Sequence, residues 1–149
     1  MMLQFLVAML VSLISIGLHA LMTVVAVDIA RRAGLRHPAR PRSHLMGVMM
    51  ATAVVLMIAH MLEVFVWAAT YAIIGVAAAE QGLLYFAFVN YTTLGYGDIT
   101  PVREWRLIGP LTAMNGVLLF GWSAAVLFEV LRKTLDHFEA AKAPGFTRP

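Results

Sequence analysis

The sequence predicts an all-α integral membrane protein with three transmembrane helices and one short re-entrant segment. Of its 149 residues, 61% are hydrophobic and 13% are charged, whereas a soluble domain carries about 25% charged residues. The apolar residues fall in blocks long enough to cross a bilayer, which takes roughly 20 residues as a helix. A third observation is the glycine-containing polar stretch TTLGYGDITP, which interrupts the apolar sequence at residues 92–101.

The first predicted helix lies in residues 3–27, which carry no charge and have His19 as their main polar interruption. The N-terminal MMLQFL has no basic residue, so we interpret this run as a membrane helix and not as a signal peptide. We assign residues 1–30 to this helix and residues 31–44 to a basic loop.

The second predicted helix covers residues 45–79, and the third lies within residues 103–133, which contain a charge-free run at 107–128. A short cytoplasmic tail is expected at 134–149. Residues 80–102 are too few to cross the bilayer and return as helix, yet GLLYFAFVNYTT is too apolar for an exposed loop. We expect a short helix and an extended return strand, a conformation that membranes tolerate where it lines a water-filled cavity.

Five arginines in the first loop predict the orientation, because short basic loops stay in the cytoplasm. The N-terminus is then outside, the C-terminus is cytoplasmic, and we expect a multi-pass protein of the plasma membrane. The net charge of +3 reflects this topology, so no nucleic-acid partner is expected. The same residues are candidates for binding anionic lipid head groups: Arg31, Arg32, Arg36, Arg40 and Arg42.

The glycine motif has the features of a cation-binding backbone. A cation that leaves water needs oxygen ligands, and successive carbonyls point to one axis only if the backbone includes positive φ, which glycine adopts without steric cost. Gly95 and Gly97 occupy the alternate positions that this requires. We expect Thr93 to add a hydroxyl oxygen, and Leu94 and Tyr96 to pack against the short helix.

Asp98 comes next and is expected at the outer mouth, where a carboxylate raises the local cation concentration. The run TLGYGD, from Thr93 to Asp98, follows an aromatic segment and precedes a transmembrane run. In this it resembles the filter of potassium channels, whose carbonyl rings replace the hydration shell of the ion. The resemblance covers residues 45–133 and implies a homotetramer, because each chain supplies one filter segment.

The resemblance implies passive, selective potassium conduction, with the ions as cargo, no cofactor and no enzymatic activity. It assigns the selectivity filter to residues 93–97. The potassium ions would bind at Thr93, Leu94, Gly95 and Tyr96. Two alternatives stay open, namely a non-selective cation channel and a membrane sensor or assembly subunit that does not conduct.

The support of the filter is where this sequence departs from the family. Val89 occupies a position in the short helix at which many members carry a carboxylate that braces the filter aspartate. We hypothesise that Glu63 supplies that carboxylate, while Tyr85 and Phe86 pack behind the filter. The alternative is that His60 and Glu63, three residues apart on one helical face, form a simple hydrogen-bonded pair.

Three positions in the third helix are candidates for gating and conduction. Gly116 and Gly121 interrupt this helix, where a glycine costs about 1 kcal/mol relative to alanine. We expect a gating hinge there, although membrane helices also use glycine for close packing. Glu129 is expected to line the inner vestibule.

His19, His60 and Glu63 form the one enzyme-like set in the sequence. The motif HxxE, formed by His60 and Glu63, offers two potential metal ligands, but a catalytic site needs a third ligand nearby. We therefore expect no metal there, and we expect a neighbouring helix to satisfy His19.

Overall fold

The computed structural model describes residues 1–34, 41–77 and 82–142, and all regular structure in these ranges is helical. Three long helices carry the fold, together with a short helix and a 3-10 turn. Their bounds are α1 Met2–Gly34, α2 Pro41–Ile74, α3 Leu83–Tyr91, η2 Arg103–Trp105 and α4 Ile108–Lys142. The predicted all-α class is confirmed.

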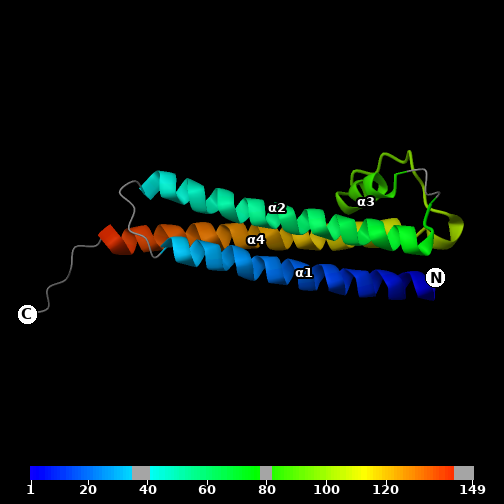
Figure 1. The fold of residues 1–149 in the computed structure, drawn as a ribbon, viewed down its shortest axis with the longest axis horizontal. Coiled ribbons are helices and arrows are strands. Elements are labelled where there is room, and N and C mark those ends of the chain that lie inside the picture. Colours follow the sequence, from blue (N-terminus) through cyan, green and yellow to red (C-terminus); the bar gives the residue numbers. More distant parts are fainter. Residues whose placement is uncertain (35–40, 78–81, 143–149) are drawn as a thin grey trace, which may run out of the picture.

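The three long helices lie side by side along the molecule (Figure 1). Each is long and apolar enough to cross a membrane, over Met2–Ala33, Arg42–Ile74 and Arg103–Glu139. At 1.5 Å per residue, helices of this length extend about 50 Å, beyond the hydrocarbon core of about 30 Å. They therefore project past the hydrocarbon region or tilt within it.

The helix ends differ from the predicted bounds. α1 continues to Gly34, into the predicted basic loop, and α4 continues to Lys142, so that helix occupies the first part of the predicted tail. α2 ends at Ile74 and not at residue 79, because Gly75 adopts a φ of 63° and turns the chain. A left-handed glycine is a common way to close a helix C-terminus.

α1 packs along both α2 and α4. Its buried residues recur every three or four positions at first, so they form one stripe. At one end of the stripe, the Gln4 side-chain carbonyl accepts a hydrogen bond from the Leu107 amide at 2.9 Å, an amide at the start of α4 that has no partner within the helix. The buried residues of α1 are Gln4, Ala8, Val11, Ser15, His19 and Ala26.

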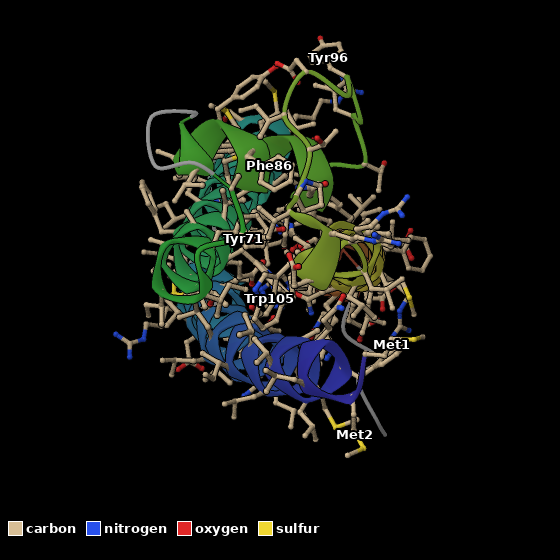
Figure 2. All side chains as sticks on the ribbon, turned by 90° about the vertical axis from the view of Figure 1, so that its right-hand side faces the viewer. Met1, Met2, Tyr71, Phe86, Tyr96 and Trp105 are labelled. Carbon is tan, nitrogen blue, oxygen red and sulfur yellow. The ribbon has the colours of Figure 1, made fainter. Side chains whose placement is uncertain are left out.

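An aromatic core fixes α3 against α2 and α4. Trp67 and Tyr71 are fully buried, and the Tyr71 and Phe86 rings face one another with centroids 5.3 Å apart (Figure 2). The Tyr71 hydroxyl hydrogen-bonds with Thr112 Oγ1 at 2.7 Å, and Trp67 Nε1 donates to Asn115 Oδ1 at 3.0 Å. Because the polar ends have partners, this core holds the short helix at a defined place.

Candidate functional site

The candidate site begins at α3, at the end of the bundle where α1 starts (Figure 1). α3 has 9 residues and is about 14 Å long, so it cannot span a bilayer. Thr92 is the C-cap of this helix, and its amide and hydroxyl both donate to the Phe88 carbonyl, at 2.9 and 2.7 Å. The short helix expected between the second and third spans is therefore present.

The segment after α3 alternates in backbone conformation. Positive φ occurs at every second residue, with 61° at Thr93, 60° at Gly95 and 77° at Gly97. A Cβ on Gly97 would meet nothing within 4 Å, and one on Gly95 would only touch the Thr93 carbonyl oxygen at 3.9 Å. The glycines are thus required for their φ angles and not for space. This is the backbone condition for carbonyls that share one axis.

Thr93 was missed as a member of this alternation. Positive φ is uncommon in residues other than glycine and costs conformational energy. The spacing of the glycines could have indicated it. Gly97 and Gly95 are two residues apart, and the next position at the same spacing is Thr93. The prediction that Thr93 contributes a hydroxyl ligand stays a prediction.

Val89 anchors the return segment through its backbone. Its carbonyl accepts the Leu94 amide at 2.9 Å and the Gly95 amide at 3.4 Å, and its side chain is 4% exposed. The expectation that Leu94 and Tyr96 pack against the short helix is wrong for a single chain. They are 53% and 68% exposed, and Tyr96 lies at the tip of the molecule, away from the aromatic core (Figure 2).

Asp98 has a partner in α3, but it is not the residue that we hypothesised. The Asp98 carboxylate lies close enough to the Tyr85 hydroxyl to raise the pKa of Tyr85. Tyr85 precedes Val89 by one helical turn, so α3 presents a polar neighbour to Asp98 from another position. Phe86, expected behind the filter, lies in the buried aromatic core.

Glu63 supports the end of α3 and does not contact Asp98, so the bracing hypothesis is wrong. Its carboxylate is fully buried and accepts a hydrogen bond from the Tyr91 hydroxyl. His19 Nδ1 lies 2.8 Å from Glu63 Oε1, and His60 Nδ1 lies 3.1 Å from Oε2. Glu63 thereby holds Tyr91, the last residue before the return segment.

These groups close into a ring that joins all four helices. His60 Nε2 lies 2.9 Å from Ser123 Oγ, which lies 3.3 Å from His19 Nε2. We call Glu63, His19, His60, Tyr91 and Ser123 the buried polar ring. The expected His60 and Glu63 pair is present. His19 finds its partners on neighbouring helices as expected, Glu63 on α2 and Ser123 on α4.

In the buried polar ring, His19 lies beside His60 and Glu63, so a third potential metal ligand is present after all. His19, His60 and Glu63 each offer a ligand atom, and these atoms lie within 4.8 Å of one another. The sequence argument against a third nearby ligand was therefore wrong. In the described structure these atoms satisfy one another by hydrogen bonding.

The two glycines of α4 have different surroundings. A Cβ on Gly116 would lie 2.0 Å from the Tyr91 carbonyl oxygen, which is impossible without movement. A Cβ on Gly121 would meet nothing within 4 Å. Gly116 is thus required for close packing of α4 against the end of α3. The hinge stays a prediction at both positions.

Charged groups gather at the opposite end of the bundle. Glu129 pairs with two bases of its own helix, Arg132 at 2.9 Å and Lys133 at 3.1 Å. It also lines a groove of about 710 Å³ between α1 and α4, together with Arg31 and Arg32. Of the predicted lipid-binding arginines, Arg36 and Arg40 lie outside the described residues.

Residues 59–133 match the model of a protein family described as an ion channel. The match covers just over half of the 149-residue chain, including the end of α2, all of α3, the return segment and most of α4. No curated protein and no solved structure matches the chain. The chain therefore belongs to this ion channel family, as a two-helix pore domain of the potassium-channel type with α1 as an additional helix.

Proposed function

We propose that the protein conducts potassium ions passively and selectively through a homotetrameric pore. One observation carries this proposal, namely the alternating positive φ at Thr93, Gly95 and Gly97 in a segment between two membrane-length helices. Four such strands would place rings of carbonyls around one axis, as in the filter of potassium channels. The ions would bind at residues 93–96.

Exposure of this segment in one chain supports the assembly. Residues 92–98 are all exposed, and the apolar side chains of Leu94 and Tyr96 are among them. Non-helical backbone at membrane depth must be covered by protein or face water in a cavity. Neighbouring copies would cover the outer side of each strand, and the ions would occupy the inner side.

The charges of the described residues suit an orientation with the filter outside. Asp98 directly follows the proposed filter, at the end of the helix bundle where α1 starts. A carboxylate at this place would concentrate cations. Arg31 and Arg32 lie at the end of α1, and we place them in the cytoplasm of a cell whose plasma membrane holds the protein. There they would bind anionic lipid head groups, with Arg42 beside them, and Glu129 would face the inner vestibule.

The decisive experiment measures the reversal potential of purified protein in planar bilayers under opposed potassium and sodium gradients. We expect current that reverses near the potassium equilibrium potential. An unselective current would indicate a general cation pore, and absence of current would indicate a non-conducting subunit. Either result would contradict the proposal.

Two variants connect the current to the backbone of the filter. Gly95→Ala and Gly97→Ala place a Cβ on residues whose φ values of 60° and 77° disfavour it, so we expect loss of selective current in both. Gly17→Ala is the matched control, because a Cβ on this helical residue of α1 meets nothing within 4 Å. Selective current that survives in both filter variants would remove the filter assignment.

A further inference from the structure

Each hydrogen bond in the buried polar ring needs one proton between its two polar atoms. Two neutral histidines do not bring enough protons for all of these contacts. All four ring nitrogens of His19 and His60 face polar atoms, at distances from 2.8 to 3.3 Å. A neutral imidazole has one N–H donor and one bare nitrogen that only accepts. The contacts therefore define how many protons the ring needs.

At the carboxylate end, both Nδ1 atoms need a proton. His19 Nδ1 faces Glu63 Oε1 at 2.8 Å, and an ionised carboxylate only accepts. His60 Nδ1 faces Glu63 Oε2 at 3.1 Å and the Tyr91 hydroxyl oxygen at 2.9 Å. Tyr91 donates its single proton to Oε2, so His60 Nδ1 meets acceptors on both sides. Each Nδ1 is therefore a donor.

At the other end, Ser123 cannot satisfy two bare nitrogens. With both Nδ1 atoms protonated, neutral histidines would present two lone pairs to Ser123 Oγ, at 2.9 and 3.3 Å. The hydroxyl has one proton and serves only one of them. If the His60 proton lies on Nε2 instead, the contact with Ser123 has its proton. His60 Nδ1 then has none for its contacts with Glu63 and Tyr91. A buried contact between two acceptors, with no proton between them, is unfavourable.

A third proton completes the ring and balances its charge. One Nε2 then donates to Ser123 Oγ, and Ser123 donates to the other Nε2. The same proton neutralises Glu63, whereas two protons would leave a net negative charge and four a net positive charge, each expensive inside a membrane. Around the histidines, the described contacts from α4 are uncharged, with Ser123, Phe120 and Trp122, and α3 contributes Tyr91.

We propose that the buried polar ring is a proton-binding site, in which His19, His60 and Glu63 together hold three protons and carry no net charge. The third proton lies on a histidine nitrogen or, after transfer along the 2.8 Å contact of His19, on the Glu63 carboxyl. It joins α1 and α2 to α4 through Ser123. The site does not depend on which ion the pore conducts.

The test counts these protons by nitrogen-15 magnetic resonance of the full chain in lipid bilayers. His37, His44 and His137 are replaced by Gln, so that only His19 and His60 carry the label. At about pH 8 an exposed histidine, with a pKa of about 6.5, is neutral. We expect three protonated nitrogens of four, or two together with a protonated Glu63 carboxyl seen by carbon-13. Two protonated nitrogens with an ionised Glu63 would overturn the proposal.

Glu63→Gln is the matched variant, because it removes the negative charge and keeps the shape of the side chain. Without that charge the third proton would leave a net positive ring, so we expect two protonated nitrogens at the same pH. Three protonated nitrogens in this variant would overturn the charge balance that we propose. If the Glu63→Gln variant fails to assemble, the number of protonated nitrogens in the protein that keeps Glu63 still tests the proposal.

Discussion

At the scale of single residues, the Asp98 carboxylate has a phenol as its neighbour in α3. Tyr85 adjoins Asp98 from one helical turn before Val89, the position at which the resemblance to potassium channels leads one to expect an acid. A phenol, unlike a carboxylic acid, stays neutral and donates a proton over the whole physiological pH range. A phenol can therefore adjoin the Asp98 carboxylate without placing a second acid beside it.

Tyr85→Phe tests this contact, because it removes the hydroxyl and keeps the ring. We expect the current to decline several-fold faster during sustained opening, since Asp98 loses its described partner at the filter mouth. The control is the same change in an Asp98→Asn background, measured by the same recordings. Contacting residues show non-additive effects, so Tyr85→Phe should add little there. An equal effect in both backgrounds would show that the two side chains act independently.

At the scale of helices, the sequence predicted which segments are helical but not which face of each helix packs against its neighbours. Long apolar runs and their breaks depend on local composition, so three membrane-length helices and a short fourth could be predicted. Which face of α1 meets which face of α2 depends on packing, so nothing local indicated that His19 reaches Glu63, 44 positions away. Ser123 carried no signal at all, since a serine in a membrane helix is common.

The backbone of residues 93–97 was predictable in more detail because the conformation it needs is set locally. Gly95 and Gly97 are needed for their own φ angles, whatever the surroundings. The contacts around this segment are not local in this sense, and two of the predicted ones were wrong. Glu63 contacts Tyr91 and not Asp98, and Leu94 and Tyr96 are exposed and do not pack against α3.

Gly116 illustrates an element-scale constraint that can be measured. Gly116→Ala puts a methyl group where the Tyr91 carbonyl lies only 2.0 Å away, so α4 must separate from α3. Overpacking of this kind costs about 1–3 kcal/mol, and we expect a lower melting temperature of the detergent-solubilised protein. The control on the same helix is Gly121→Ala, which meets nothing within 4 Å and should gain up to about 1 kcal/mol in helix propensity.

A Gly116→Ala protein that melts at or above the wild-type temperature would contradict the close approach of α4 to α3. The pair of variants also separates packing from gating. An altered open probability in Gly121→Ala, without a loss of stability, would favour a hinge. The same change in Gly116→Ala would not, because that variant alters the support of the filter as well.

At the scale of the whole molecule, the pore that we propose needs four copies of the chain. Residues 92–98 are exposed, and in the proposed tetramer the carbonyls of four such segments would repel one another without a cation between them. Bound ions should therefore stabilise the assembly. The stabilisation follows the binding equilibrium and reaches about 2.7 kcal/mol when the ion is at one hundred times its Kd.

We accordingly expect the melting temperature of the assembled protein to rise with potassium concentration and to respond much less to sodium at equal ionic strength. Thermal unfolding in detergent measures this, with native mass spectrometry to establish that the species has four copies of the chain. Gly95→Ala, whose filter backbone is strained at a φ of 60°, should lose the potassium response, whereas Gly17→Ala should keep it. Equal melting temperatures in both salts, or a potassium response that persists in Gly95→Ala, would mean that ions do not bind where the alternating backbone suggests.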